Sequence, residues 1–175
     1  VELMAHRKPE IVFHLAAQAL VPVARRHPLS TFESNVRGTW VVLEACRQVG
    51  GIEQIVVASS DKAYGEHDVL PYREDTPLRP RGPYDVSKAC ADLIARSYAW
   101  EWDLPIAVTR CGNLFGGGDF NFSRLVPGVI RDLLRNTRPV IRSDGSPVRD
   151  YIHAADGASG YLAVAETLAE RPELR

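Results

Sequence analysis

The sequence predicts an α/β fold built on a doubly wound parallel sheet. Three short apolar segments, at 11–15, 55–58 and 104–110, have the composition of buried parallel strands. Two long segments between them, 28–49 and 83–102, repeat apolar residues at helical spacing. Strands that alternate with helices in this way favour a parallel sheet with helical crossover connections.

The two long helices are each expected to bury one apolar stripe. Pro83 suits the first turn of the second helix, and Gly50-Gly51 end the first. The expected stripe of the first helix is Phe32, Val36, Trp40, Leu43 and Val49. The expected stripe of the second helix is Ala89, Leu93, Ile94, Ser97 and Trp100.

The remaining segments are assigned from their composition. Residues 65–81 are rich in proline and charge, which indicates an exposed loop. Residues 111–124 hold too many glycines for a helix or a strand. The pattern then predicts an amphipathic helix at 125–136, a short strand at 139–142 and a final helix at 154–170.

Composition excludes several functional classes. The 175-residue chain has a formal net charge of −1, which gives no electrostatic reason to expect nucleic acid or an anionic membrane as a partner. No apolar run is long enough to span a bilayer. The five histidines show no metal-ligand spacing, so no metal site is expected. Three scattered cysteines favour a reduced, cytoplasmic setting.

The chemistry is expected where the second strand ends. Polar residues Ser59-Ser60-Asp61-Lys62 follow that strand, at the edge where open α/β sheets bind ligands. Tyr84 and Lys88 lie four residues apart at the start of a helix, and therefore one turn apart on one face. A neighbouring ammonium favours the phenolate form and lowers a tyrosine pKa from its usual value of about 10. Ser60 and Tyr84 would then share the hydroxyl of a bound alcohol, with Tyr84 as the base.

Other motifs accompany this serine–tyrosine–lysine set in the same order. They are HLAA at 14–17, N-x-x-G-T at 35–39 and R-D-Y-I-H at 149–153. Together they resemble the extended, nucleotide-sugar-modifying branch of the short-chain dehydrogenase/reductases, over nearly the whole chain. The resemblance implies an incomplete Rossmann-like domain, NAD as cofactor, a nucleotide-diphosphate sugar as substrate, and a homodimer formed through the two long helices.

The resemblance also implies a role for individual residues. The catalytic residues would be Ser60, Asp61, Lys62, Tyr84 and Lys88. The cofactor would contact Leu15, Ala16, Ala17, Asn35, Ser59, Tyr84 and Lys88. The sugar nucleotide would contact Asn113, Arg124 and Arg149, the last through a forked guanidinium that suits a diphosphate.

Simpler roles stand beside several of these. His14 is expected to be a packed core histidine, and Asn35 is either a surface residue or one that orders the active site. Arg149 either binds the diphosphate or forms an ion pair with Asp150. The glycine run at 116–118 is a flexible turn or a loop on the diphosphate side, and it lacks the Gly-Lys-Ser/Thr ending of a P-loop.

The pair Asp61-Lys62 decides between reactions of the resembled family. Epimerases of that family usually carry small or uncharged residues after the serine, whereas dehydratases carry an ionisable pair. By resemblance this favours a 4,6-dehydratase of the CDP-glucose type, with Asp61 as the acid and Lys62 as the base or its partner. A nucleotide-sugar 4-epimerase is the alternative, and Asp61 and Lys62 would then only pair with each other.

Two regions are expected along the chain. Residues 1–111 would form part of an NAD-binding domain that carries the catalytic residues, and residues 112–175 part of a small substrate-binding region interleaved with the sheet. No G-x-G-x-x-G loop precedes the first strand. The chain is therefore expected to be a fragment that is inactive alone, and an inactive binding module is a further alternative.

Overall fold

The computed structural model of the chain describes residues 1–171 and 173, in two compact units. The first unit contains Val1–Cys111 and Tyr161–Arg175, and the second contains Gly112–Gly160. The predicted boundary lies at the same point, but the prediction placed every residue from 112 onward in the second region. The functional roles of the two regions remain predictions.

A three-stranded parallel sheet forms the centre of the first unit and confirms the predicted α/β fold. The strands are β1 (Ile11–His14), β2 (Gln54–Ala58) and β3 (Ile106–Thr109), in the order β1-β2-β3. Because β2 is the central strand, Ile55, Val56 and Val57 are fully buried, and they pair in register with both neighbouring strands. All three strands therefore end at the same edge, where the polar residues 59–62 begin.

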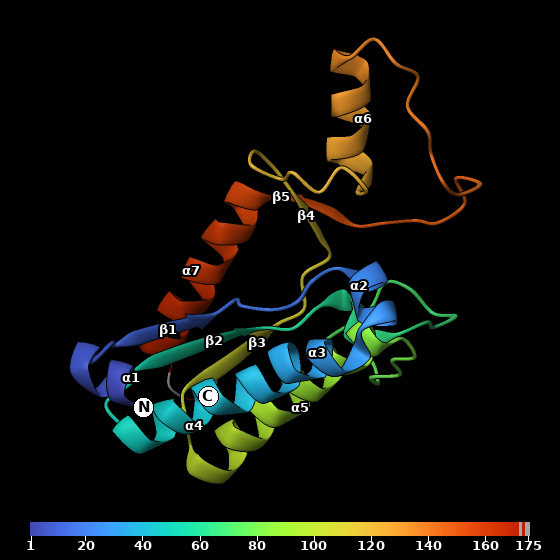
Figure 1. The fold of residues 1–175 in the computed structure, drawn as a ribbon. Helices are drawn as coiled ribbons and strands as arrows, with labels where there is room; N and C mark the ends of the chain where they lie inside the picture. Colours follow the sequence, from blue (N-terminus) through green and yellow to red (C-terminus); the bar gives the residue numbers. More distant parts are fainter. Residues whose placement is uncertain (172, 174–175) are drawn as a thin grey trace. The chain divides into compact units, whose positions relative to one another are not determined.

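Helices lie on both faces of this sheet. In Figure 1, α4 (Gly38–Val49) and α5 (Pro83–Trp102) lie together on one side of it. The C-terminal part of α7 (Ala154–Glu170) lies on the other side. The hydroxyl of Thr109 in β3 donates to that of Tyr161 in α7 at 2.8 Å. The buried core of the unit joins both long helices to the sheet through Leu43, Cys46, Ile52, Ile55, Val57, Ala95 and Ile106.

The first long helix is interrupted by a π-helical turn that the sequence did not predict. It comprises α3 (Pro28–Phe32), the π-helical segment η1 (Glu33–Arg37) and then α4. The buried side chains of this helix are polar in its first part and apolar in its second part. They include Thr31, Asn35, Thr39, Leu43 and Cys46. The predicted stripe was wrong at Trp40, which is 43% exposed.

The bounds of α5 match the predicted helix, but its buried face does not. Leu93 and Trp100 are 54% and 91% exposed, so they do not pack against the sheet. The helix instead buries small and polar residues, which allow close approach to the strands: Ser87, Lys88, Ala89, Ala91, Asp92 and Ala95.

A short 3₁₀ helix, η2 (Asp61–Tyr64), follows β2 and was not predicted from the sequence. Gly65 ends it with φ 75°, and a Cβ at this position would collide with the carbonyl of Arg79. Glycine is therefore required for the loop to return over η2. The loop at 65–81 follows as predicted, without a helix or a strand among its residues.

The second unit contains a pair of short parallel strands, β4 (Asn113–Phe115) and β5 (Tyr151–His153), and the helix α6 (Leu125–Leu134). The predicted strand at 139–142 was wrong, because these residues pair with no strand. The glycine-rich segment was also misjudged, since its residues 113–115 form β4. The predicted helix at 154–170 is α7.

Two shorter helices complete the first unit, α1 (Glu2–Arg7) and α2 (Val21–Arg26). Within residues 1–171, no helix is both long and apolar enough to cross a membrane. In the described part of the chain, no three His, Cys, Asp or Glu side chains gather where they could hold a metal ion.

Candidate active site

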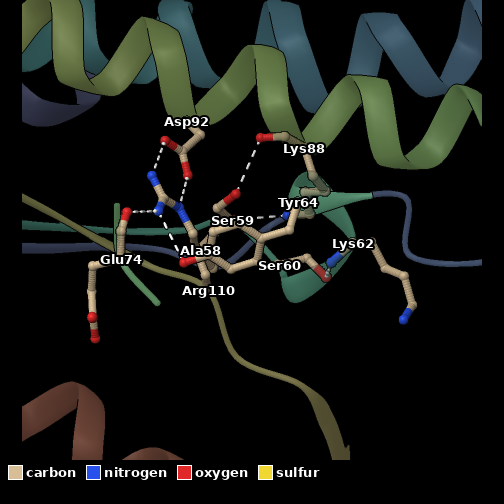
Figure 2. Close-up of polar contacts among 9 residues, drawn as sticks. All are labelled: Ala58, Ser59, Ser60, Lys62, Tyr64, Glu74, Lys88, Asp92 and Arg110. Carbon is tan, nitrogen blue, oxygen red and sulfur yellow. Dashed lines mark hydrogen bonds and ion pairs between the residues drawn. The ribbon is translucent and has the colours of Figure 1, made fainter. Parts of the chain in front are cut away.

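Lys88 reaches from α5 to the end of β2 and is almost fully buried. Its Nζ donates a hydrogen bond to the carbonyl oxygen of Ala58 at 2.8 Å (Figure 2). Burial disfavours the charged ammonium and lowers the pKa of Lys88 from 10.5 to about 8. An ammonium carries three N–H donors, of which this carbonyl takes one. Lys88 therefore presents a poorly solvated charge at the sheet edge.

The residues after β2 form a connected polar turn. The hydroxyl of Ser59 donates to the backbone carbonyl of Lys88 at 3.2 Å, which ties the strand end to α5. Ser60 caps η2 by accepting from the backbone N–H of Lys62 at 3.3 Å. It also donates to Asp61 Oδ1 at 3.0 Å. Ser60 is thus fixed beside the charged pair.

Asp61 and Lys62 form the ion pair that the sequence analysis gave as the simpler alternative. Lys62 Nζ lies 3.1 Å from Asp61 Oδ2, and the side chains are 35% and 22% exposed respectively. Partial burial leaves both groups within reach of a ligand. The pairing does not exclude catalysis, because transfer of one proton from Lys62 to Asp61 gives a base and an acid side by side.

Tyr84 begins the face of α5 that carries Lys88, and it is partly buried. Its backbone carbonyl accepts a hydrogen bond from the Ser87 hydroxyl at 2.7 Å. Burial raises the pKa of Tyr161, and the nearby Tyr84 adds to this rise. Because α5 packs against η2, Tyr84 and Lys88 lie at the same sheet edge as Ser60, Asp61 and Lys62.

Asn35 is a buried network residue, so the surface alternative was wrong. Its Oδ1 accepts from the Gln18 backbone N–H at 2.7 Å. Its Nδ2 donates to the Gln18 carbonyl at 3.0 Å and to the Ser87 hydroxyl at 2.8 Å. Asn35 therefore links the segment after β1 to α5, from within a π-helical turn of the kind often found at functional sites.

His14, at the end of β1, is a buried core histidine. Its Nε2 lies 3.1 Å from the Thr39 hydroxyl, which donates to the Asn35 carbonyl at 2.6 Å. Burial, and next the charge of Lys88, lower the pKa of His14. The side chain thus supports the Asn35 network rather than facing a ligand.

The three small or apolar residues after β1 are accessible. Leu15 and Ala16 are exposed and Ala17 is half-buried. They follow a strand that pairs with β2, so they leave the sheet at the same edge as Ser60. Small side chains there allow a ligand to approach the backbone closely.

In the second unit, Asn113 and Arg124 line one small cavity of about 130 Å³. Among the described residues, Asn113 Nδ2 is the buried side-chain nitrogen or oxygen that lacks a hydrogen-bond partner. A buried donor without a partner is costly, so Asn113 Nδ2 is a candidate contact for a ligand acceptor. Arg124 is held by Asp119 at 2.8 Å and by the Leu114 carbonyl.

Arg149 does not line this cavity. It is exposed and donates to the carbonyl of Val148, its neighbour in the chain, at 2.7 Å. The ion pair with Asp150, proposed as the alternative, is absent among the described residues. A larger apolar cavity of about 530 Å³ lies in the same unit, but none of the predicted site residues lines it.

Three residues near the site were not predicted from the sequence. Asp85 follows Tyr84, and burial raises its pKa, with Lys62 and Asp61 close enough to affect it. Arg110 and Asp92 form a buried ion pair at 2.7 Å beside η2. The only available signal was spacing, since Asp92 continues the four-residue series of Tyr84 and Lys88.

Comparison with known proteins identifies the family. The model of the NAD dependent epimerase/dehydratase family matches residues 1–174. The chain belongs to this family. The predicted resemblance is thereby confirmed.

The most similar relatives include dehydratases of nucleotide sugars. CDP-glucose 4,6-dehydratase of Salmonella typhimurium is 39% identical over 94% of this chain and 48% of its own length. dTDP-glucose 4,6-dehydratase of Streptomyces griseus is 35% identical over 87% of this chain and 46% of its own length. The chain thus spans about half the length of these two relatives.

Solved structures with a similar fold include both reaction types. DesIV, a dTDP-glucose 4,6-dehydratase of Streptomyces venezuelae with NAD bound, has a TM-score of 0.84 and 31% identity, over 96% of this chain and 51% of its own. UDP-glucose 4-epimerase of Thermotoga maritima has a TM-score of 0.86 and 30% identity, over 94% of this chain and 56% of its own.

Proposed function

We propose that the protein carrying this chain is an NAD-dependent nucleotide-sugar 4,6-dehydratase of the CDP-glucose type. The observation that carries the proposal is the ion pair of Asp61 and Lys62, held 3.1 Å apart beside Ser60. Elimination across C5 and C6 needs an acid and a base next to the group that oxidises C4. The 39% identity to a CDP-glucose 4,6-dehydratase supports the choice of nucleotide.

Features of the sheet edge fit the nicotinamide end of NAD. Lys88 offers an ammonium with donors beyond the one that Ala58 takes, which suits ribose hydroxyls. Leu15 and Ala16 are exposed where a planar ring would approach the backbone. We propose that these residues hold the cofactor together with Ala17, Asn35, Ser59 and Tyr84. NAD, when bound, would accept hydride from C4 and return it at C6.

In this proposal Tyr84 and Ser60 act on the C4 hydroxyl. The Tyr84 phenolate, favoured by the nearby Lys88 ammonium, removes the hydroxyl proton as the C4–H bond breaks. Ser60 donates a hydrogen bond to the resulting oxygen. The C4 carbonyl acidifies the neighbouring C5–H bond, which prepares the elimination.

Asp61 and Lys62 then carry out the elimination. Transfer of a proton from Lys62 to Asp61 within the pair leaves Lys62 a neutral amine and Asp61 a carboxylic acid. The base, Lys62 or its partner, then removes the C5 proton, and the electron pair forms the C5–C6 double bond. Asp61 protonates the C6 hydroxyl, which leaves as water when the C6–O bond breaks. A proton returned to C5 and the hydride returned to C6 complete a 4-keto-6-deoxy sugar, with no net change of redox state.

Asn113 and Arg124 are proposed to bind the sugar nucleotide, and Arg149 its diphosphate. The unpartnered Nδ2 of Asn113 offers a donor to a substrate oxygen in the cavity that Arg124 also lines. Among the described residues, the exposed guanidinium of Arg149 bonds a single backbone carbonyl, which leaves donors for a diphosphate.

The test is incubation of the intact protein with NAD and a panel of nucleoside-diphosphate hexoses. A 4-keto-6-deoxy product, formed fastest from CDP-glucose, is expected. Tyr84→Phe should slow C4 oxidation by about 10²- to 10⁴-fold, because it removes the base and keeps the ring. Survival of that step in Tyr84→Phe would refute the assigned base.

A nucleotide-sugar 4-epimerase is the second candidate, favoured by the likeness to the Thermotoga maritima epimerase. The two reactions differ in their need for Asp61 and Lys62. In a dehydratase, Asp61→Asn and Lys62→Met block product formation. Inversion at C4 that proceeds unchanged in both variants would establish the epimerase instead.

We also propose a homodimer formed through α4 and α5. Large apolar side chains on these helices are exposed, including Trp40, Val41, Leu93 and Trp100. Exposed apolar surface of this kind marks interaction sites. Sedimentation of the intact protein should give a dimer that Trp100→Glu converts to monomer, and a monomeric wild type would reject the proposal.

The protein is proposed to work in the cytoplasm. Its cysteines Cys46, Cys90 and Cys111 are free thiols, as expected in a reducing compartment. Fractionation of the source cells would test this, and recovery in another compartment would contradict it.

A further inference from the structure

Arg110 connects three separate segments beside the candidate active site. Its Nε and Nη2 donate to the two carboxylate oxygens of Asp92 in α5, at 2.7 and 2.9 Å. Its Nη1 donates to the Tyr64 hydroxyl at 3.0 Å and to the Glu74 carbonyl at 2.8 Å. Figure 2 shows the guanidinium between these groups, at the end of β3.

Asp92 places this contact on the catalytic side of α5. Tyr84, Lys88 and Asp92 are each four residues apart, so they follow one another along one side of the helix. Lys88 bonds the end of β2 through Ala58, and Asp92 bonds the residue that follows β3. The carboxylate of Asp92 is fully buried, so its position is fixed by Arg110.

Tyr64 carries the contact into η2. It is the last residue of η2, the turn that begins with Asp61 and Lys62. The guanidinium of Arg110 lies 5.0 Å from the centre of the Tyr64 ring, and Tyr72 stacks on Tyr64 at 4.9 Å. The Tyr72 hydroxyl donates to the Gly65 carbonyl at 2.7 Å. Arg110 thus holds η2 and the loop after it through side chains packed on one another.

We propose that Arg110 is a positioning residue that fixes η2, with Asp61 and Lys62, against α5, with Tyr84 and Lys88. This inference rests on the proposed dehydratase function, in which α5 supplies the C4 base and η2 the elimination groups. Both groups must reach adjacent carbons of one sugar, so their separation must be held closely.

A direct catalytic role is not assigned to Arg110. Four of its five N–H donors are used by Asp92, Tyr64 and Glu74, and its side chain is only 14% exposed. The hydrogen bonds to Asp92 raise the pKa of Arg110 further above its ordinary value. The guanidinium therefore stays protonated near neutral pH. Its effect is transmitted through Tyr64.

The test separates oxidation from elimination in single turnovers of the intact protein with NAD and CDP-glucose. Tyr64→Phe keeps the stacked ring and removes only the bond to Arg110. Arg110→Lys keeps the positive charge beside Asp92 but loses the paired guanidinium donors that bond both of its oxygens. Tyr98→Phe is the matched control, because Tyr98 lies on α5 and its hydroxyl also bonds a charged side chain, that of Glu44.

The expected result is a selective loss of the second step. Elimination should slow about tenfold in Tyr64→Phe and about 10²-fold in Arg110→Lys, with C4 oxidation within about twofold of wild type. An undehydrated 4-keto hexose would accumulate. Tyr98→Phe should change neither rate. If C4 oxidation and elimination slow by the same factor in Tyr64→Phe, or if neither slows, the inference is wrong. Tyr64→Phe decides the matter if Arg110→Lys does not fold.

Hydrogen–deuterium exchange gives a readout that is independent of activity. Peptides from 61–81 should exchange faster in Tyr64→Phe and in Arg110→Lys, while peptides from 83–102 remain unchanged in Tyr64→Phe. Unchanged exchange at 61–81 in both variants would overturn the inference. A wild-type protein that makes no 4-keto-6-deoxy sugar would instead reject the proposed function, and the exchange result would still decide whether Arg110 holds η2.

Discussion

Replacing Lys88 by methionine should stabilise the protein while it abolishes activity. The pKa of Lys88 falls from 10.5 to about 8 because the ammonium is buried. At about 1.4 kcal/mol per pKa unit, that shift costs ~3 kcal/mol of folding free energy at neutral pH. Methionine fills the same space without a charge, but it loses the bond to Ala58, which contributes ~1 kcal/mol. The expected net gain is ~2 kcal/mol near pH 7.

The pH dependence gives this prediction its sharpest form. Below a pH of about 8, the pKa of Lys88 in the folded protein, Lys88 is protonated in both the folded and the unfolded state. The full free-energy cost of burying its charge is then present. Between about 8 and 10.5 only the unfolded chain binds it, so the stability of the wild type rises with pH relative to Lys88→Met. Urea unfolding of both proteins at several pH values in this window measures the difference. Parallel stability profiles would refute the claim that burial sets the pKa.

Two other buried groups lead to predictions of the same kind. Asn35→Leu should lower the free energy of unfolding by ~3 kcal/mol, because it removes three hydrogen bonds to Gln18 and Ser87. A loss below ~1 kcal/mol in urea unfolding would contradict the network. His14 has a lowered pKa, so only the unfolded chain binds a proton as the pH falls just below 6.5, and stability is lost there. His14→Gln should reduce this loss of stability at acid pH. The measurement is the difference in unfolding midpoint between about pH 7 and about pH 5. An identical difference in the wild type and the variant would show that another group is responsible.

Local patterns explain what the sequence predicted well. The bounds of α5 and α7 follow from helical spacing and from Pro83 at the first turn, which depend only on nearby residues. The position of Ser60 follows from the rule that parallel strands end at one edge. The four-residue spacing of Tyr84 and Lys88 needs no knowledge of the rest of the fold.

Contacts between distant segments explain what could not be predicted. The pairing of β4 with β5 joins residues almost forty positions apart, and nothing in either tripeptide indicates its partner. Asn35 is polar, so the sequence left it as either a surface residue or one that orders the active site, because its partners Gln18 and Ser87 lie far along the chain. Apolar character likewise put Trp100 in the packing stripe of its helix, although its side chain is 91% exposed in the single chain.

The π-helical turn η1 helps to keep the buried residues of the first long helix on one side. In an α-helix, residues four apart advance around the axis by about 40°, so a run of three such steps drifts by about a third of a turn. Thr31, Asn35, Thr39 and Leu43 keep that spacing and all remain buried, because the wider winding at Glu33–Arg37 takes up part of the drift. Deleting one residue there would restore regular winding and rotate Asn35 away from Ser87, even though the composition of the helix would hardly change.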